Sequence, residues 1–346
     1  MGEYARCLAI ARAASRRWQG AAIRFVLSRE APYAADASFP ATLLDASPTF
    51  HSAAVIELLE SWRPDVVIFD NAGRTAQLRA AQRLGARVVY ISARGRQRRK
   101  AFRWRWMPLI DEHWIAYPEF IAGSLSVLER LKLKMAGRPA VRYLDVILSR
   151  ADPAQSAAIL ARAGCNPGTF VLVVPGGGTG HPGVDDAAER FKSAARALAD
   201  SGVATVYVGP GHEHSAPGDP AAAPNWHPLG PLPQAELVEL MRAARLIIAN
   251  GGSTLLQAIA GGNACIAVAI AKDQAERIRR CVAAGVALAA PLDAPGMVQS
   301  ANRLLQDEST LAALKARSAQ LGLADGVEVA LQALAGLLPA HGAAAR

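Results

Sequence analysis

The chain has 346 residues, 51% of them hydrophobic, and a formal net charge of +9 at pH 7. This length and hydrophobic content suffice for two domains with separate cores, and the positive charge predicts an anionic partner: nucleic acid, an acidic membrane surface or an anionic substrate. No apolar run reaches the roughly 18 residues of a membrane span. Glu3 and Arg6 interrupt the start, which therefore does not resemble a signal peptide. The four cysteines lack metal-ligand spacing, which predicts reduced thiols in a cytoplasmic protein.

Short hydrophobic strands alternate with amphipathic helices along the first half of the chain. The expected helices span residues 4–17, 51–62 and 75–84, and the expected strands span residues 22–27, 65–70, 87–91 and 113–116. The first three residues lead directly into a helical pattern, although a Rossmann-like domain should open on a strand. We hypothesise that this first strand is missing and that the protein begins further upstream.

The same alternation continues through the second half of the chain. The expected strands span residues 170–174, 204–208, 246–249 and 265–268, and the expected helices span residues 185–200, 234–242, 253–260 and 273–284. Continuous apolar strands between helices are typical of parallel sheets that are covered on both faces. The sequence therefore predicts an α/β protein with two Rossmann-like domains, at residues 1–160 and 161–335, and a flexible Ala/Gly-rich tail at 336–346.

Two glycine-rich turns in the second half each join an expected strand to an expected helix. Residues 175–180 read PGGGTG, and residues 249–258 read ANGGSTLLQA. Such turns leave backbone N–H groups aimed outward, and the helix dipole adds partial positive charge, so each turn can bind an anion. Two such turns predict a nucleotide diphosphate and hence a nucleotide-sugar enzyme. The expected donor-binding residues are Gly176, Gly177, Gly178, Thr179, Gly251, Gly252, Ser253 and Thr254.

Four histidines are further candidates for binding or catalysis. His181 follows the first glycine turn and is placed to reach a donor phosphate, whereas His113 lies within an expected strand and is expected in the core. His212 and His214 share a loop rich in Gly and Pro, but no carboxylate or cysteine pattern completes a metal site with them. We therefore expect no metal and no cofactor, the nucleotide sugar being a substrate.

The second half resembles the C-terminal domain of the GT-B glycosyltransferases, in particular that of the MurG transferases and of the UDP-sugar hydrolase of pseudaminic acid synthesis. The resemblance covers residues 168–285 and rests on the order and spacing of several segments. These are residues 176–178, 229–232, 241–248, 251–254 and 271–274. It implies two Rossmann-like domains whose parallel sheets face each other across a cleft, with the nucleotide sugar held by the C-terminal domain.

Three more donor-binding residues follow from this resemblance. In GT-B enzymes the helix after the second turn carries a Glu that binds the ribose, and the matching residue here is Gln257, whose amide can still donate and accept hydrogen bonds. An Asp-Gln element that touches the donor sugar corresponds to Asp273 and Gln274. The alternatives are an ordinary polar helix residue for Gln257 and a helix cap for Asp273.

Residues 2–11 resemble the first loop and helix of the same superfamily. The pseudaminic-pathway hydrolase carries a catalytic His before an Arg-Cys-Leu segment; here Glu3 stands at the His position, while Arg6, Cys7 and Leu8 match. The resemblance therefore disfavours that hydrolase. Kdo transferases use a Gly-Glu in this loop with the carboxylate as the base, which implies that Glu3 is the general base. In a closed cleft its pKa can be raised. The alternative is a first-turn Glu that favours the helix dipole.

Asp70 ends an expected parallel strand, at the edge of the sheet where α/β proteins bind ligands. It is the second candidate for the base, or a ligand of the acceptor hydroxyl. The alternative is that it caps the following helix.

The strongest charge feature is residues 94–106, RGRQRRKAFRWRW, which hold seven cations. Cations interleaved with aromatic residues suit an anionic membrane surface or a phosphorylated lipid acceptor. The alternatives are a solvated basic loop and nucleic-acid binding, and the nucleotide-sugar turns disfavour the latter. The expected acceptor-binding or membrane-binding residues are Arg98, Arg99, Lys100, Arg103, Trp104 and Trp106.

Together these patterns predict an inverting, metal-independent glycosyltransferase of cell-envelope glycan synthesis. It moves a sugar, UDP-linked by family analogy, to a glycan or lipid-linked acceptor, in the cytoplasm or peripherally on the inner membrane face. Two alternatives remain open. One is a nucleotide-sugar hydrolase or epimerase of the same fold, and the other is a non-catalytic relative that binds a nucleotide sugar.

Overall fold

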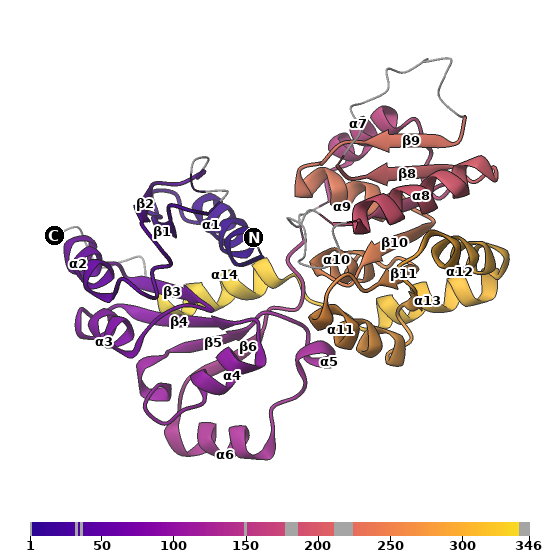
Figure 1. Ribbon diagram of the computed structural model, residues 1–346. Helices are drawn as coiled ribbons and strands as arrows, with labels where there is room; N and C mark the ends of the chain where they lie inside the picture. Colours follow the sequence, from indigo (N-terminus) through magenta and orange to yellow (C-terminus); the bar gives the residue numbers. More distant parts are fainter. Residues whose placement is uncertain are drawn as a thin grey trace. The chain divides into compact units, whose positions relative to one another are not determined.

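The computed structural model describes residues 2–31, 34, 37–148, 151–176, 186–210 and 224–338. The chain divides into two compact units (Figure 1). The first unit runs to Ile147 and resumes at Ala324, and the second unit is Leu148–Leu323. Each unit contains a parallel sheet with helices packed against it, as the alternating pattern of the sequence predicts.

The first unit opens on a helix and alternates strands with helices. Its strands are β1 (Phe25–Ser28), β2 (Ala41–Leu44), β3 (Val66–Asp70), β4 (Arg87–Ser92), β5 (Glu112–Ile115) and β6 (Ala140–Tyr143). Its helices are α1 (Gly2–Arg17), α2 (Ser52–Trp62), α3 (Thr75–Arg83), α4 (Gly95–Ala101), the 3-10 helix η1 (Met107–Leu109), α5 (Glu119–Ala122), α6 (Val127–Ala136) and α14 (Gly326–Leu337).

The strands of the first unit form two separate sheets. Strands β3, β4, β5 and β6 pair in that order, all parallel, and β1 pairs in parallel with β2 alone. Among the described residues no strand precedes α1, so the expectation of a further strand there stays a hypothesis.

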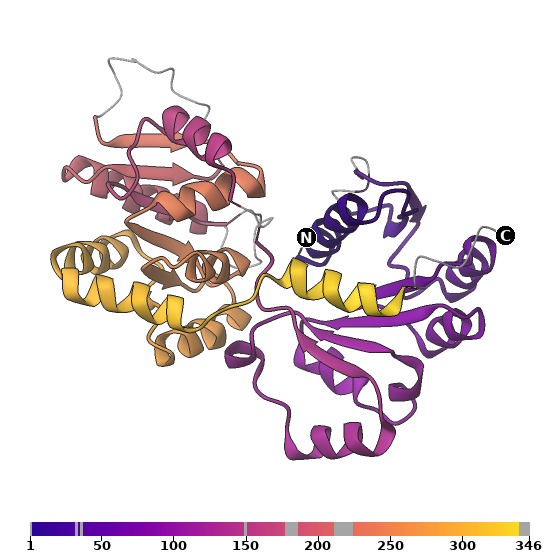
Figure 2. The ribbon, with the colours of Figure 1, turned by 180° about the vertical axis from the view of Figure 1, so that it is seen from behind.

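Helix α14 differs from the sequence expectation, which assigned residues 161–335 to the second domain. Its buried residues Ala330, Ala333 and Leu334 pack with Ile10 of α1 and with the core side chains of β4 and β5. Figure 2 shows α14 beside α1 within the first unit. These apolar contacts attach α14 to the first unit, although 176 residues of the second unit, Leu148–Leu323, precede it in the chain. The expected boundary at residue 160 also falls inside a helix of the second unit.

The second unit contains one sheet of six parallel strands. Its strands are β7 (Val171–Val174), β8 (Thr205–Val208), β9 (Trp226–Leu229), β10 (Leu246–Asn250), β11 (Cys265–Val268) and β12 (Leu288–Ala290). Its helices are α7 (Pro153–Ala163), α8 (Ala187–Asp200), α9 (Gln234–Ala243), α10 (Ser253–Ala260), α11 (Lys272–Ala283), α12 (Ala294–Gln306) and α13 (Glu308–Gln320). Alternate strand residues, such as Val171 and Val173, pack with α8 and α12 in the main core.

The strand order of the second sheet is β12-β11-β10-β7-β8-β9. From β7 the chain builds the sheet outward through β8 and β9, and it then returns to add β10, β11 and β12 on the other side of β7. The neighbours β7 and β10 therefore form the topological switch point, where open α/β sheets bind their ligands at the carboxyl ends of the strands. Both glycine turns follow these two strands.

None of the helices within the described ranges combines the length and the apolar character needed to cross a membrane.

Candidate functional site

At the switch point, Asn250 ties the two glycine turns together. Its Nδ2 donates to the carbonyl of Pro175 at 2.7 Å, and its Oδ1 accepts the backbone N–H of Gly252 at 2.9 Å. The side chain is buried. Sequence reasoning included Asn250 in the motif without giving it a role. The sequence does contain a signal for this role, because Asn250 is the one polar residue of an otherwise apolar strand.

At Gly176, in the described part of the first turn, a side chain would collide with this bridge. Its φ is +94°, and a Cβ there would lie 2.2 Å from Asn250 Nδ2. Only glycine combines that backbone conformation with so close an approach. The other residues predicted in this turn, Gly177, Gly178 and Thr179, and the neighbouring His181 lie outside the described residues, as do His212 and His214.

Helix α10 begins directly after the second turn. Gly252 is its N-cap, and as a glycine it has no side chain that could cap the helix. Gly251 is buried, Ser253 is exposed and Thr254 is half-buried. The first backbone N–H groups of α10 and the positive end of its dipole are therefore available to an anion.

Arg277, which the sequence analysis did not single out, brings a cation to the same turn. Its guanidinium donates to the carbonyl oxygen of Gly251 and forms an ion pair with Asp273 at 3.5 Å. Asp273 is exposed and lies one helical turn before Arg277 on α11. The Arg277 side chain thus stabilises the second glycine turn through its carbonyl, and its positive charge lies beside the candidate anion site.

The other predicted donor-binding residues have different surroundings. Gln274 is buried, and its Oε1 accepts the backbone N–H of Ile270 at 3.1 Å, so this side chain stabilises the loop before α11. Asp273 does not cap α11, because the N-cap is Ala271 and no side chain caps that end. Gln257 is buried on α10. Among these three residues, only Asp273 lies on the surface.

In the first unit, Asp70 at the end of β3 is engaged by Arg6 of α1. The Arg6 guanidinium donates to both carboxylate oxygens, at 2.9 and 2.8 Å, and the two side chains are 9% and 6% exposed. Burial raises the pKa of Asp70, while the ion pair with Arg6 works in the opposite direction. The thiol of Cys7 lies 3.6 Å from the same carboxylate. Asp70 thus helps to fix α1 on the sheet, and its role as a base or acceptor ligand stays a prediction.

Asn71, the next residue, holds the predicted base Glu3. Its Nδ2 donates to Glu3 Oε1 at 3.0 Å, and its Oδ1 accepts the backbone N–H of Ala93, after β4, at 2.8 Å. The backbone φ of Asn71 is +53°, in the left-handed region that few non-glycine residues adopt. Sequence reasoning missed this residue, although Asn is among the residues that tolerate such a conformation.

The pKa of Glu3 is lowered, which is the reverse of the shift expected for a carboxylate in a closed cleft. Burial alone would raise the pKa, but the hydrogen bond from Asn71, a backbone N–H at the start of α1 and the charge of Arg6 together outweigh it. Glu3 is partly buried, and its lowered pKa means that it is ionised at neutral pH. The helix-dipole alternative and the role as a base are compatible, because both need the charged form.

The basic segment 94–106 is not a free cationic loop. Arg98 turns inward, where it binds both carboxylate oxygens of Glu129, at 3.1 and 2.9 Å, and the carbonyls of Ala122 and Gly123. Arg98 is thus used to hold α4, α5 and α6 together. This corrects its expected role in binding an acceptor or a membrane, because its donors are taken up within the unit.

Lys100 and Trp106 also differ from the expectation. The Trp106 ring is fully buried, and its Nε1 donates to Thr75 Oγ1 at 3.0 Å. The Lys100 ammonium lies 4.0 Å from the centre of that ring and donates to the carbonyl of Gly73 at 2.9 Å. Burial and the neighbouring arginines lower the pKa of Lys100 to about 8. Trp106 is therefore a core residue, and of the six predicted residues Arg99, Arg103 and Trp104 are exposed.

His113 is buried, as expected of a core histidine. One ring nitrogen lies 2.8 Å from Ser92 Oγ, and burial lowers its pKa to about 3, so the ring is neutral. Across the described ranges, no three side chains among His, Cys, Asp and Glu are grouped so that they could hold a metal ion.

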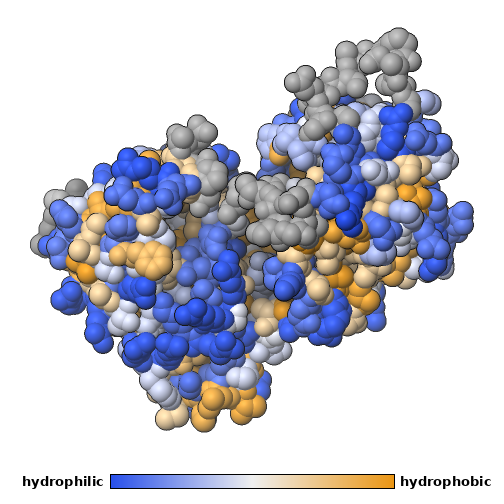
Figure 3. Space-filling model, in the orientation of Figure 1, coloured by the Kyte–Doolittle hydropathy of each residue, from blue (hydrophilic) through white to orange (hydrophobic). Residues whose placement is uncertain are grey.

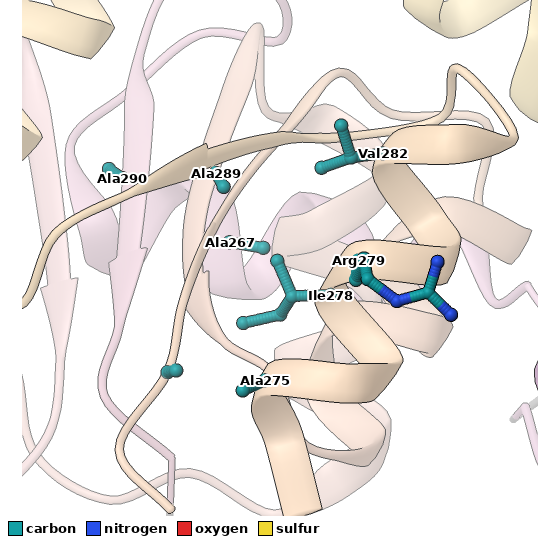
Figure 4. A pocket seen from close by; sticks show the side chains of 8 residues that line it. Ala267, Ala275, Ile278, Arg279, Val282, Ala289 and Ala290 are labelled. Atoms are coloured by element: carbon teal, nitrogen blue, oxygen red, sulfur yellow. The ribbon is translucent and has the colours of Figure 1, made fainter. Parts of the chain in front are cut away.

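A cavity of about 380 Å³ lies in the second unit between α11 and strands β11 and β12 (Figure 4). Its walls are small apolar side chains, with Arg279 as the one cation among them, and Arg279 is paired with Glu276. None of the residues predicted for the donor lines it. The candidate site is therefore the pair of turns at the switch point and not this cavity.

Comparisons with known proteins add evidence on the fold. Neither the protein-family models nor the curated proteins gave a match. Among solved structures, the chain is similar to MurG of Acinetobacter baumannii, with a TM-score of 0.62 and 16% identity over 97% of this chain and 96% of that one. The chain is also similar to Phytolacca americana UGT2 complexed with UDP-2-fluoro-glucose and pterostilbene. The TM-score is 0.65, with 12% identity over 98% of this chain and 97% of that one.

A UDP-N-acetylglucosamine 2-epimerase is also similar, with a TM-score of 0.58 and 15% identity over 94% of this chain and 91% of that one. These identities are low, but the likeness extends over nearly the whole length of each chain. The chain therefore has the GT-B fold, an α/β fold with parallel sheets in two separate domains.

Proposed function

We propose that the protein is an inverting glycosyltransferase that moves a sugar from a nucleoside-diphosphate donor, UDP-linked, to a hydroxyl of a cell-envelope glycan or lipid-linked acceptor. The observation that carries the proposal is the Asn250 bridge, which fixes Gly176 beside the uncapped start of α10 at the switch point. The fold likeness supports it, because one similar structure is a complex with UDP-2-fluoro-glucose.

The second unit would hold the donor diphosphate through backbone groups. The N–H groups at the start of α10, the helix dipole and the nearby Arg277 guanidinium would stabilise the negative charge that grows on the leaving diphosphate. Ser253 and Thr254 would add hydroxyl donors. These groups are fixed before the ligand arrives, and preorganised donors cost little reorganisation during the reaction.

The first unit would supply the base. An acceptor hydroxyl would lose its proton to the Glu3 carboxylate while its oxygen forms a bond to the anomeric carbon. The bond from that carbon to the diphosphate oxygen would break, its electron pair leaving with the diphosphate, and a single displacement inverts the anomeric carbon. The lowered pKa keeps Glu3 ionised but makes it a weaker base. The proton would therefore move late in this single step, as the bond to the diphosphate breaks.

The donor half of this proposal is tested by calorimetric titration of the purified chain with UDP, GDP, ADP, CMP and dTDP. We expect selective binding of one diphosphate, UDP by analogy. The double variant Ser253→Ala/Thr254→Val should bind it about tenfold more weakly, since each hydroxyl contributes a hydrogen bond to a charged group. Ser300→Ala, on helix α12, is the control. Absence of binding by every diphosphate would refute the donor site.

An epimerase or hydrolase of the same fold is the second candidate, because an epimerase is among the similar structures. The two functions differ in what happens to the donor alone. We would incubate the selected nucleotide sugar with the protein, without acceptor, and follow it by NMR. A donor that persists unchanged supports the transferase, whereas a free sugar or a new epimer supports the alternative.

A further inference from the structure

Helix α6 has an apolar stripe that no described residue covers. None of its ten residues is buried, and Val127, Leu128, Leu131 and Met135 are 74%, 61%, 50% and 68% exposed. Leu128, Leu131 and Met135 follow the i, i+3, i+7 spacing that puts side chains on one helix face. Surface helices normally turn that face to the core, so an outward apolar stripe marks an interaction site.

The helix is attached to the first unit through polar contacts at its start and along another face. Ser126 and Glu129 form a reciprocal capping box at its start, and Gly137 ends it in the left-handed conformation. Arg98 clamps Glu129 from α4, and the Lys132 ammonium donates to the carbonyl of Phe102 at 3.2 Å. These contacts hold α6 in one orientation. The exposed stripe is therefore a fixed part of the surface and does not belong to a frayed helix.

Cations surround the stripe. Arg130 and Lys134 are exposed on α6 itself, and the only acidic residue of the helix, Glu129, is held by Arg98. Trp104, 51% exposed, lies next to the helix, with the Lys132 ammonium 5.9 Å from its ring, and exposed Arg103 and Arg105 flank it. Figure 3 shows hydrophobic residues gathered at the end of the first unit where Figure 1 places α6.

We propose that α6 and Trp104 form a docking surface for a bilayer that contains anionic phospholipids. The apolar stripe would enter the headgroup boundary, and the flanking cations would lie at the level of the phosphates, the arrangement of interfacial amphipathic helices. The absence of an unpaired acid on the helix favours an anionic partner. This surface replaces Arg98, Lys100 and Trp106, which the sequence had suggested and which are engaged within the unit. The inference does not depend on the proposed function.

Vesicle co-sedimentation of the full chain tests this surface, with phosphatidylcholine vesicles that contain or lack phosphatidylglycerol. The wild-type protein should sediment with the anionic vesicles, and less so at high salt. The variant Leu128→Gln/Leu131→Gln/Met135→Gln should bind them at least about tenfold more weakly, because it removes the inserted side chains but keeps good helix formers. Arg130→Gln/Lys134→Gln should weaken binding and reduce its salt dependence.

The control is Phe50→Gln/Val282→Gln, which removes two exposed apolar side chains elsewhere and should bind as the wild type does. Circular dichroism should show the same helix content in all variants, because the changed residues are exposed. A wild-type protein that stays in solution with both kinds of vesicle would overturn the proposal, and so would a stripe variant that sediments normally. If the stripe instead mediates self-association in sedimentation velocity, it is a contact between copies and the lipid proposal is wrong.

Discussion

Each unit places an asparagine at the carboxyl end of a parallel strand, but the two side chains are used differently. Asn250 ends β10 and links backbone groups only, from Pro175 to Gly252. Asn71 follows β3 and links a backbone N–H, that of Ala93, to the carboxylate of Glu3. At this end of its strand the second unit thus offers fixed backbone dipoles, whereas the first offers an ionised side chain. The difference suits a donor diphosphate in one unit and a base in the other.

The largest loss of unfolding free energy is expected when the buried Arg6–Asp70 ion pair of the first unit is broken. Arg6→Met would leave Asp70 buried without its partner, and breaking a buried ion pair in this way costs about 3–5 kcal/mol of unfolding free energy. Urea unfolding measures this loss. The double variant Arg6→Met/Asp70→Leu should recover much of it. Nucleotide binding by the second unit should persist in both variants, and a single variant as stable as the wild type would show that the pair contributes nothing.

In the second unit, stability depends on the absence of a side chain at Gly176. Gly176→Ala combines an unfavourable φ of +94° with a Cβ that would lie 2.2 Å from Asn250 Nδ2. We expect a loss of about 2–4 kcal/mol in unfolding free energy, together with loss of nucleotide binding. Gly202→Ala is the matched control, because its φ is +92° but nothing lies within 4 Å of the added Cβ. Equal losses in the two variants would contradict the importance of the Asn250 bridge.

A smaller effect concerns the titration of Glu3. Asn71→Gly keeps the left-handed backbone but removes a hydrogen bond that favours the charged carboxylate, so the pKa of Glu3 should rise. The acid side of the rate profile should then move to higher pH. NMR titration of the labelled glutamate carboxyl measures the shift directly. An unchanged pKa would mean that Asn71 does not hold the carboxylate.

The smallest effect is expected at Lys100. Its pKa is lowered to about 8, so between pH 8 and 10.5 the unfolded chain binds more protons than the folded one, and the contribution of this group to stability rises with pH. The wild type should therefore gain unfolding free energy relative to Lys100→Met as the pH is raised through this window. Denaturation at several pH values shows this, with Lys134→Met as the control. A constant difference would rule out the buried ammonium.

The sequence predicted those features that depend on neighbouring residues. Apolar runs followed by glycines located β7, β10 and the start of α10, because strand, turn and helix patterns are local. The Arg6–Asp70 pair joins residues 64 positions apart, and Arg98 meets Glu129 across 31 positions. No local pattern distinguishes such a paired arginine from a free one, which explains the misplaced role of the basic segment.

The same limit applies to α14 and to α6. The return of α14 to the first unit depends on the fit of its apolar face to the core, which follows from no turn or cap in its own sequence. The stripe of α6 has the pattern of an ordinary surface helix, and only the structure shows that it faces outward.

The measurement that tests the account most directly is transfer by Glu3→Gln with the nucleotide sugar that the binding panel selects and a membrane-extracted acceptor pool. Diphosphate release and donor affinity would be measured together, with Glu57→Gln on the exposed side of α2 as the control. We predict a rate about 10²–10⁴-fold lower with donor affinity unchanged, since a general base contributes this much and the donor is held by the other unit. Unchanged release in Glu3→Gln would contradict the account.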